Sequence, residues 1–387
     1  MASRADVLVV GLGAMGSAVL DQLAARGARA VGFDRHTPPH AEGSSHGETR
    51  ITRRAVAEGD AYVPLVTRSH QIWREIERET GAELFTACGT LVMGPEATGG
   101  EGKSDFVHRT LRVAERAGIS HEALAGDEIA ARFPFMDDTH GTIGCFEPGG
   151  GYVRPERCIA EQLARARRNG ALVEANTDVL GLEDDGSGVV LRTARGDWRA
   201  PVAVVAAGAW TASLLGAPFD RLLSVRRQVL HWFPLAAEAP ISSRDPVYIR
   251  MLGDREGDHF YGFPPLPGER RVKVATEQTE RDTDPGAGWK RVDPAESDEM
   301  YARHLTGRLR GVRPGADDAL ACLYTVTPDG GFIVDRHPSM SRVTVVSACS
   351  GHGFKHSAGL GAALAAGLAG DSDSIADLAP FSLRRFG

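Results

Sequence analysis

The sequence predicts an α/β protein, α+β overall, in which a parallel nucleotide-binding sheet is combined with an antiparallel sheet. Three observations support this fold class. A continuous apolar run at 7–10 leads into a glycine-rich turn, which is typical of a parallel strand buried on both faces. Strand-like runs at 227–233, 259–263 and 271–276 indicate an antiparallel sheet. Near the end, a strand and glycine turn at 343–353 repeat the first pattern.

The elements follow one another in an order that interrupts the nucleotide-binding unit. The chain opens with a β-α-β unit made of strand 6–10, helix 17–26 and strand 29–33. Residues 83–150 mix short strand-like runs with loops. Further elements are expected as helices at 63–80, 153–170 and 357–368 and as strands at 171–183, 188–193, 202–208 and 343–347.

The return of the first pattern near the end predicts a discontinuous nucleotide-binding domain. We assign to this domain residues 1–83, 152–224 and 325–387. The β-rich insertions at 84–151 and 225–324 then form a second domain. With 387 residues the chain is long enough for two cores, because single cores stop growing near ~250–300 residues.

Composition and charge exclude several classes of function. The net charge of −7 argues against nucleic acid or an anionic membrane as the main partner. No stretch approaches ~18 uninterrupted apolar residues and the first residues lack a secretory signal, so we expect no membrane span and a cytoplasmic location. The histidines have no metal-binding spacing, so no metal is expected. An odd number of cysteines without a CxxC pair favours reduced thiols: Cys88, Cys145, Cys158, Cys322 and Cys349.

The turn at 11–16 has the spacing GxGxxG at the junction of a strand and a helix. Gly11 permits the tight turn, Gly13 lets the backbone approach a pyrophosphate, and Gly16 allows the helix to pack closely on the strand. Asp34, at the end of the second strand, can accept hydrogen bonds from a ribose diol and disfavours NADP. An ordinary glycine-rich turn would not account for the flanking strand, helix and acid. The sequence therefore predicts a Rossmann-type dinucleotide site.

The turn itself does not distinguish FAD from NAD. Nicotinamide enzymes commonly keep the nucleotide fold in one contiguous stretch, whereas this chain returns to it at 204–210 and again after residue 343. Late-returning segments of that kind contact a long dinucleotide such as FAD, so by analogy of fold the residues favour FAD.

Several ordered segments resemble a single family. They lie at 43–53, 62–65, 261–264 and 332–335, and the strongest match is Ser-Gly-His-Gly-Phe-Lys at 350–355. They make the chain similar to the family of monomeric sarcosine oxidase and N-methyltryptophan oxidase. The resemblance implies a two-domain fold, with FAD extended through the Rossmann-type domain and the amine held against the antiparallel sheet of the second, substrate domain.

The resemblance also implies the reaction. The family oxidises N-methyl or cyclic secondary amino acids by hydride transfer to the flavin. Molecular oxygen then takes the electrons and leaves as hydrogen peroxide, while the imine product hydrolyses. The partners implied are FAD, O₂ and a small amino acid, and the chain is expected to be a monomer.

Cys322 lies in Cys-Leu-Tyr-Thr, where the family attaches FAD covalently. Composition alone would favour a buried strand cysteine. The resemblance instead implies a bond from the thiolate sulfur to the 8α-methyl group of the flavin, which a nearby cation would assist by lowering the thiol pKa.

Lys273 alternates with Val272 and Val274 on an expected strand, so it faces the side opposite to theirs. A solvated lysine on the outer face of a sheet is the commoner case. In the family this position holds the lysine over the flavin that speeds the reaction with oxygen, because a fixed cation stabilises the charge that develops there.

Arg53 and Lys355 match the pair that holds the substrate carboxylate in the family. Arginine can bind a carboxylate in bidentate fashion, and lysine adds a point charge. An ordinary surface arginine is the alternative for Arg53. Arg50 matches a position beside the flavin ring, where a cation favours the anionic reduced flavin. The catalytic residues implied are thus Lys273, Arg50, Arg53 and Lys355.

Further positions are implied to touch the cofactor or the substrate. The turn 351–353 offers N–H groups to the flavin at a helix start, so His352 is expected at the cofactor rather than in acid–base catalysis. The cofactor contacts implied are Gly11, Gly13, Ala14, Met15, Gly16, Asp34, Arg35, Ser44, Thr49, Arg50, Val179, Cys322, Gly351, His352, Gly353, Phe354 and Lys355. The substrate contacts implied are Arg53, Tyr261, Glu277, Tyr324 and Lys355. Either tyrosine could instead be a packed strand residue.

Three residues depart from the family pattern. Glu277 stands where relatives have a histidine, four residues after Lys273. Its anion would repel a substrate carboxylate unless it is protonated, points away or pairs with a basic group on the substrate. His356 stands where the family has phenylalanine, and Cys349 where it has a larger apolar residue. These changes indicate a reshaped pocket, so sarcosine is not assumed to be the substrate.

Three alternatives stay open. A dehydrogenase on the same fold would pass its electrons to another acceptor, which Lys273 argues against. A non-catalytic FAD-binding protein would need neither that lysine nor Cys322, Arg53 and Lys355. An oxidase of a basic or biosynthetic amine is the third alternative, raised by Glu277.

Overall fold

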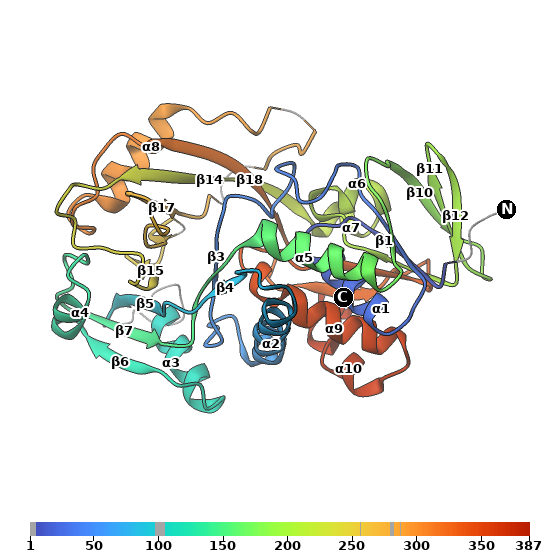
Figure 1. Ribbon diagram of the computed structural model, residues 1–387, viewed down its shortest axis with the longest axis horizontal. Helices are drawn as coiled ribbons and strands as arrows, with labels where there is room; N and C mark the ends of the chain where they lie inside the picture. The colour runs from blue at the N-terminus through green and yellow to red at the C-terminus, as the bar shows by residue number, and fades with distance from the viewer. Residues whose placement is uncertain (1–4, 97–104, 256, 279–281, 287) are drawn as a thin grey trace.

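The computed structural model describes residues 5–96, 105–255, 257–278, 282–286 and 288–387. Two bodies lie side by side, one built on a six-stranded sheet and the other on an eight-stranded sheet (Figure 1). Each sheet draws strands from distant parts of the chain. The predicted fold class, a Rossmann-type sheet beside a largely antiparallel one, is confirmed.

The six-stranded sheet carries the glycine turn. β1 (Val7–Val10) lies between β2 (Ala30–Phe33) and β13 (Val202–Val205) and runs parallel to both. The outer strands are β9 (Leu172–Glu174), β20 (Val343–Ser347) and β19 (Ile333–Arg336), in the order β19-β20-β13-β1-β2-β9. β19 runs antiparallel to β20, and the other pairings are parallel.

The eight-stranded sheet has the order β18-β14-β17-β16-β15-β5-β7-β6. Its neighbours run antiparallel except β15 and β5, which pair in parallel, so the sheet is mixed rather than purely antiparallel. Its strands are β5 (Thr90–Pro95), β6 (Glu122–Ala125), β7 (Thr142–Glu147), β14 (Ser224–Pro234), β15 (Val247–Met251), β16 (His259–Gly262), β17 (Arg271–Ala275) and β18 (Asp318–Val326).

Smaller sheets and helices complete the fold. One small sheet consists of β10 (Val179–Asp184), β11 (Val189–Thr193) and β12 (Gly196–Ala200), and the other of β3 (Arg50–Thr52), β8 (Gly151–Val153) and β4 (Phe85–Thr86). The longer helices are α1 (Ala14–Ala25), α2 (Val63–Thr80), α3 (Phe106–Arg116), α5 (Pro155–Arg168) and α9 (Ser357–Leu368). None of the helices in the described ranges is long and apolar enough to cross a membrane.

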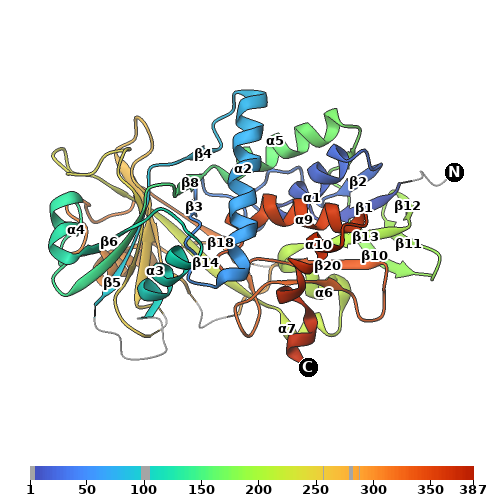
Figure 2. The ribbon, with the colours of Figure 1, turned by 90° about the horizontal axis from the view of Figure 1, so that it is seen from below.

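Both faces of β1 are covered, which explains its continuous apolar run. Val7 and Val9 share one core with residues of α1, α5 and α9, and Figure 2 shows these helices grouped apart from β10–β12. Leu8 and Val10 share a second core with residues of β11. A strand packed on both faces needs an apolar residue at every position.

A buried ion pair fixes α1 on α5. Asp21 of α1 is fully buried and accepts hydrogen bonds from Arg165 of α5, from Nε at 2.7 Å and from Nη2 at 2.5 Å. A bidentate pair orients the two elements as well as stabilising them. It therefore holds α1, whose first turn borders the site, in one position.

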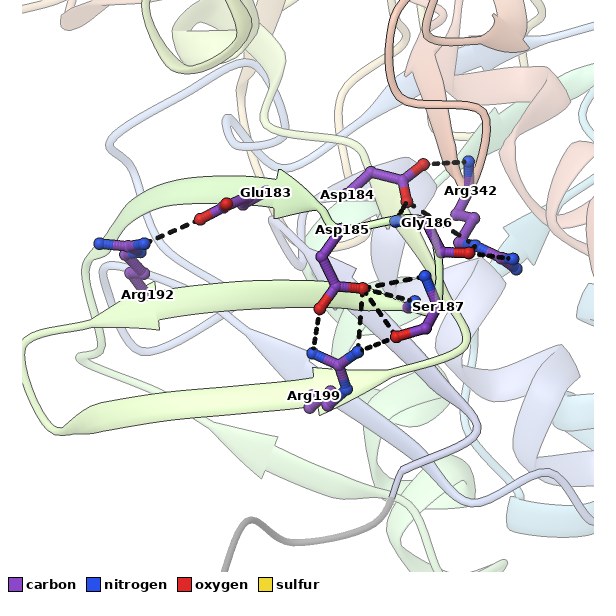
Figure 3. A network of polar contacts seen from close by, with 9 residues as sticks. Glu183, Asp184, Asp185, Gly186, Ser187, Arg192, Arg199 and Arg342 are labelled. Carbon is purple, nitrogen blue, oxygen red and sulfur yellow. Dashed lines mark hydrogen bonds and ion pairs between the residues drawn. The ribbon is translucent and has the colours of Figure 1, made fainter.

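Charged side chains close the turn between β10 and β11 (Figure 3). Asp185 accepts hydrogen bonds from the Ser187 N–H and from Arg199, both at 2.9 Å. Arg342 donates to the Gly186 carbonyl at 2.7 Å and so ties this turn to the segment before β20. Because these groups are exposed to solvent, their pairing contributes little to stability.

Most predicted elements lie within a few residues of their observed positions. α2, α9 and β20 have the predicted bounds, whereas α1 begins at Ala14 instead of residue 17. The single strand expected at 171–183 is two strands, because β9 joins the six-stranded sheet and β10 a small one. The division into two domains stays a prediction. The strands of the six-stranded sheet lie within the ranges assigned to the nucleotide-binding domain, and those of the eight-stranded sheet lie within the ranges of the second domain, except at the ends of β14 and β18.

Candidate active site

Two cavities adjoin, because Arg50, Tyr324, Gly351 and Phe354 line both. The first, here called the nucleotide cavity, has a volume of about 440 Å³ and is lined by the glycine turn and by residues between 33 and 45, 177 and 180, 206 and 214, and 346 and 354. The second, here called the charged cavity, has a volume of about 470 Å³ and is lined by residues that include Arg53, Glu58, Arg109, His259, Tyr261, Lys273, Glu277 and Lys355.

The glycine turn fits a pyrophosphate. A Cβ on Gly11 would lie 2.5 Å from the Ala206 carbonyl oxygen, and one on Gly16 would lie 1.7 Å from the Gly11 carbonyl oxygen, so both positions need glycine. At Gly13 the nearest atom would be Ser45 Oγ at 3.9 Å, which leaves open space over the start of α1. No side chain caps this helix, so its first N–H groups are available to an anion.

Asp34 is buried beside the turn. Its carboxylate accepts hydrogen bonds from the Leu12 N–H at 2.8 Å and the His36 N–H at 2.9 Å, and it lies 3.2 Å from His40 Nε2. Burial opposes ionisation, but these hydrogen bonds lower the pKa of Asp34, so the carboxylate is charged. Its contact with a ribose stays a prediction, and His40 is a neighbour that the sequence did not indicate.

The predicted cofactor residues divide into three groups. Those that line the nucleotide cavity are Gly11, Gly13, Ala14, Met15, Asp34, Arg35, Ser44, Arg50, Val179, Gly351, Gly353 and Phe354. Those that line the charged cavity and not the nucleotide cavity are Thr49, His352 and Lys355. Gly16 and Cys322 line neither cavity: Gly16 packs against the turn, and Cys322 lies in a hydrophobic cluster.

Lys273 faces inward from β17. Its Nζ donates to the carbonyl oxygens of Gly47 at 2.6 Å and Thr49 at 2.7 Å and lies 4.1 Å from the ring centroid of Phe263. Only 4% of the residue is exposed, so the alternative of a solvated lysine on the outer sheet face is wrong. Burial and the Arg50 guanidinium lower the pKa of Lys273 well below its usual value.

Arg50 lies at the junction of the two cavities. Its guanidinium donates to the Thr49 carbonyl at 2.9 Å and to the Ser44 carbonyl at 2.8 Å. Both acceptors are backbone atoms that hold the guanidinium in place, and no carboxylate of the described residues pairs with it. Lys273 and Arg50 thus bind the same short loop, with the Thr49 carbonyl in common.

A carboxylate that the sequence did not indicate joins Arg53 to Lys355. Glu58 accepts from Arg53 Nη2 at 3.2 Å and from Lys355 Nζ at 3.1 Å. Arg53 also donates to the Ala55 carbonyl, and Lys355 to the His352 carbonyl at 2.9 Å. Each cation still has donors left over, since arginine carries five N–H groups and lysine three. An acidic residue five positions after Arg53 was the only available signal for Glu58.

Burial sets the charges of this group. It opposes ionisation of Glu58, but Lys355 and Arg53 hold the Glu58 pKa well below its usual value. Burial lowers the pKa of Lys355 to about 8, although Glu58 opposes the shift. Burial also lowers the pKa of His352 to about 4, so this histidine is neutral at pH 7. Near pH 7 the group therefore holds two cations and one anion.

Glu277 neither points away from the charged cavity nor stands alone. It lines the cavity, and its Oε2 lies 3.6 Å from Nε2 of His259 on β16. Its Oε1 lies 2.6 Å from the position that a Cβ on Gly351 would take, at the junction of the cavities. A protein base is thus its neighbour, a pairing that the sequence did not indicate because 18 positions and a turn separate the two residues.

Cys322 lies beside the junction. It shares a hydrophobic cluster with Tyr324, and burial raises its pKa above the usual value, although Arg50 and Lys273 limit the rise. Cys349, by contrast, lines the nucleotide cavity. The hydroxyl oxygens of Tyr261 and Tyr324 lie 3.3 Å apart, and both residues line the charged cavity; their contact with a substrate stays a prediction.

Two further residues of the charged cavity come from α3. The guanidinium of Arg109 lies 6.0 Å and that of Arg53 lies 5.2 Å from the ring centroid of Phe106. The mixed pattern around α3 did not reveal this helix as part of a site. His356 lines neither cavity, because its buried ring packs among Tyr62, Phe332 and His352.

No group of three or more His, Cys, Asp and Glu side chains that could hold a metal ion occurs in the part of the chain that the structure describes. The two cavities differ in the groups that they offer. One offers backbone donors to an anionic dinucleotide, and the other offers cations to a small acidic molecule.

Comparison with known proteins supports this description. The model of the family described as FAD dependent oxidoreductase matches residues 6–366. The chain is 35% identical to a monomeric sarcosine oxidase from Bacillus sp. (strain B-0618), over 100% of this chain and 97% of that protein. It is 33% identical to an N-methyl-L-tryptophan oxidase from Escherichia coli, over 98% and 99%. The solved structure of NikD, an unusual amino acid oxidase essential for nikkomycin biosynthesis, superposes with a TM-score of 0.79 at 25% identity, covering 98% of this chain and 97% of that one.

Proposed function

Because the chain belongs to the FAD dependent oxidoreductase family, and within it to the group of monomeric sarcosine oxidases and N-methyl-L-tryptophan oxidases, we propose that it oxidises a small secondary amino acid with molecular oxygen. The predicted family and the predicted enzyme class, an FAD-dependent amine oxidoreductase, are confirmed. The observation that carries the proposal is a single cavity in which Lys273, Arg53 and Lys355 adjoin the nucleotide cavity.

The nucleotide cavity would hold FAD. The turn at Gly13 and the start of α1 would bind the pyrophosphate, Asp34 the ribose, and Arg50 and Gly351 the flavin end, because these two residues line both cavities. When bound, FAD would supply a hydride acceptor that O₂ can reoxidise: an N-methyl or cyclic amino acid would lose a hydride and become an imine that hydrolyses, and O₂ would become hydrogen peroxide.

Arg53 and Lys355 would hold the substrate carboxylate. Both side chains are nearly fully buried, and Glu58 fixes their positions while leaving donors on each. The charge of Glu58 also keeps Lys355 protonated at neutral pH, since it raises the pKa that burial lowers. We therefore assign Glu58 as a positioning residue for the carboxylate site.

Lys273 would assist the step with oxygen. Two backbone carbonyls fix its Nζ and favour its charged form, against burial and the Arg50 guanidinium, which lower its pKa. The cavity excludes most water from it. A fixed cation stabilises the negative charge that forms on oxygen during electron transfer. This residue favours an oxidase over a dehydrogenase that uses another acceptor.

Cys322 would carry the flavin through a C–S bond that replaces one C–H bond of the 8α-methyl group; the two electrons released would reduce the flavin ring, and O₂ would reoxidise it. The support is its burial beside Arg50 and Lys273, whose charges favour the thiolate against the effect of burial. We expect acid-denatured protein to retain yellow flavin after gel filtration, and the Cys322→Ala variant to release it. Cys349→Ala is the matched control and should retain the flavin. Release of flavin from the unaltered protein would reject the covalent bond. Release of flavin from Cys349→Ala but not from Cys322→Ala would place the bond at Cys349.

The reaction is tested with a panel of N-methyl amino acids, cyclic imino acids and basic secondary amines. Flavin absorbance is followed without oxygen, and peroxide is measured after air is admitted. We expect bleaching and one peroxide per amine oxidised. Bleaching without peroxide would indicate a dehydrogenase, and no bleaching with any amine would reject the proposed activity.

The assembly is proposed by analogy and composition. The sarcosine oxidases that the chain resembles are named monomeric, so we propose a monomer. All five cysteines are unpaired, which fits the reducing cytoplasm as its location.

A further inference from the structure

Arg109, on α3, places a cation in the wall of the charged cavity. The proposed function gives this residue no role. Its guanidinium lies over Phe106, the same ring that the guanidinium of Arg53 contacts from the carboxylate site. Arg109 Nε is buried and has no hydrogen-bond partner among the described residues. The cavity wall nearby includes the apolar side chains of Ile249 and Met251.

The other charged groups around this cavity have protein partners. Glu58 pairs with Arg53 and Lys355, and Asp329 pairs with Arg385 at 2.6 Å. Glu277 lies beside His259. Arg50 and Lys273 donate to backbone carbonyls. Within the ranges that the structure describes, Arg109 is the cation of this cavity with neither a carboxylate nor a carbonyl as its partner.

A partly buried guanidinium without an acceptor is unfavourable, because it loses water and gains no hydrogen bond in return. A ligand that supplies an acceptor would restore the lost hydrogen bond and so bind favourably. A carboxylate matches the planar fork of arginine with two parallel hydrogen bonds. Because Arg53 and Arg109 contact one phenyl ring, a single short molecule with two carboxylates can reach both guanidinium groups.

We infer that Arg109 binds a second carboxylate of the substrate, so that the preferred substrates are secondary amino acids with an acidic side chain. The inference rests on the proposed function and adds the side-chain class to it. Arg53 and Lys355 would take the α-carboxylate, Arg109 the side-chain carboxylate, and Ile249 and Met251 would contact the methylene groups between them.

The position of Glu277 suggests the alternative of a substrate with a basic side chain. Its carboxylate lies by Gly351 and Tyr324 at the junction of the cavities, not on α3. A basic side chain on the substrate would be drawn to Glu277 and repelled by Arg109. Acidic and basic substrates of similar length therefore distinguish the two sites.

The test compares the kcat/KM values of N-methyl-L-glutamate, its uncharged isostere N-methyl-L-glutamine and α-N-methyl-L-lysine. We expect the acid to exceed the isostere by about 10- to 100-fold, the range of a hydrogen-bonded charge pair. Arg109→Gln should reduce this ratio to near one, and Arg109→Lys should keep part of it.

Arg112→Gln is the control, because Arg112 lies on the same helix, pairs with Asp105 at 2.7 Å and is 51% exposed. It should leave the ratio unchanged.

Binding provides a second measurement. Glutarate should perturb the visible absorption of the bound flavin at a lower concentration than butyrate, and Arg109→Gln should remove the difference. Equal kcat/KM values for the acid and the isostere, a preference for the lysine derivative, or an Arg109→Gln effect that is the same for all three amines would overturn the inference. If no secondary amine bleaches the flavin, the proposed function itself has failed; if the neutral amines do so without a preference for the acid, only the role of Arg109 has failed.

Discussion

The two cavities of this protein are built in different ways. Glycine turns and the start of α1 form part of the wall of the nucleotide cavity and present backbone groups to it. The charged cavity is walled by ionised side chains whose partners come from distant segments, as Glu58 and Lys355 are 297 positions apart. A cavity walled by backbone groups depends on its shape, so that an added side-chain atom should prevent binding. A cavity walled by charged side chains depends on their pairing, so that removal of a paired carboxylate should weaken binding.

The same difference affects how charge is tolerated. In the nucleotide cavity the N–H groups at the start of α1 carry partial charges that need no counter-ion. In the charged cavity a buried cation is unfavourable unless an acceptor pairs with it. Glu58 supplies that acceptor twice, and backbone carbonyls supply it for Lys273. Arg53, Lys355 and Lys273 are thus paired within the protein, whereas Arg109 has no carboxylate or carbonyl partner among the described residues.

The largest expected effect comes from adding one methyl group to the glycine turn. In Gly16→Ala the new Cβ would lie 1.7 Å from the Gly11 carbonyl oxygen, so α1 must move. We expect a loss of about 3 kcal/mol or more in the free energy of unfolding, together with loss of FAD. Urea denaturation and flavin content measure the two effects.

Gly13→Ala is the matched variant, because its Cβ would meet only Ser45 Oγ at 3.9 Å. It should fold with a free energy of unfolding within about 0.5 kcal/mol of the unaltered chain, yet contain less flavin, because the methyl group enters the space for the pyrophosphate. Normal flavin content in Gly13→Ala would contradict the idea that backbone shape defines this cavity.

The next largest effect concerns Lys273. In Lys273→Met, stopped-flow measurements should show reoxidation by O₂ slower by about 100- to 1000-fold, because a fixed charge near the developing anion is lost. Anaerobic reduction by the amine should change far less. Lys290→Met is the control, since Lys290 is 51% exposed and pairs with Glu42. A slowing of reduction equal to that of reoxidation would reject the oxygen-specific role.

The smallest effect is a pH dependence of carboxylate binding. The pKa of Lys355 is about 8, so its charge is present below pH 8 and lost above it. The Kd of a simple carboxylate inhibitor without an amine should therefore rise with pH, by about tenfold near pH 9. Glu58→Gln should move this rise to lower pH, because Glu58 raises the Lys355 pKa. Lys355→Arg should abolish it, since arginine stays charged. An unchanged pH profile in Glu58→Gln would show that the two side chains are not coupled.

Much of the fold and part of the site could be predicted from the residues. The continuous apolar run of β1 and the spacing of the glycines are local patterns, and the structure places them at the centre of the six-stranded sheet. The short mixed runs between 83 and 150 could not be assigned to elements from the sequence, because they join the eight-stranded sheet through β5, whose partner β15 lies far along the chain, while β7 and β6 pair onto β5 in turn. The roles of Lys273, Cys322 and the other site residues stay predictions.

The sequence by itself determined the dinucleotide turn, the family and the residues that carry charge. The turn and the family can be recognised from the order of residues along the chain, because the strand, the glycine turn and the start of the helix follow one another directly. Only the tertiary structure decided how the charges are paired. Glu58 and His259 were not expected at the site, and Arg109 lies on a helix that was not predicted. Electrostatic pairing depends on distance in space, and folding brings together groups that the chain order keeps far apart.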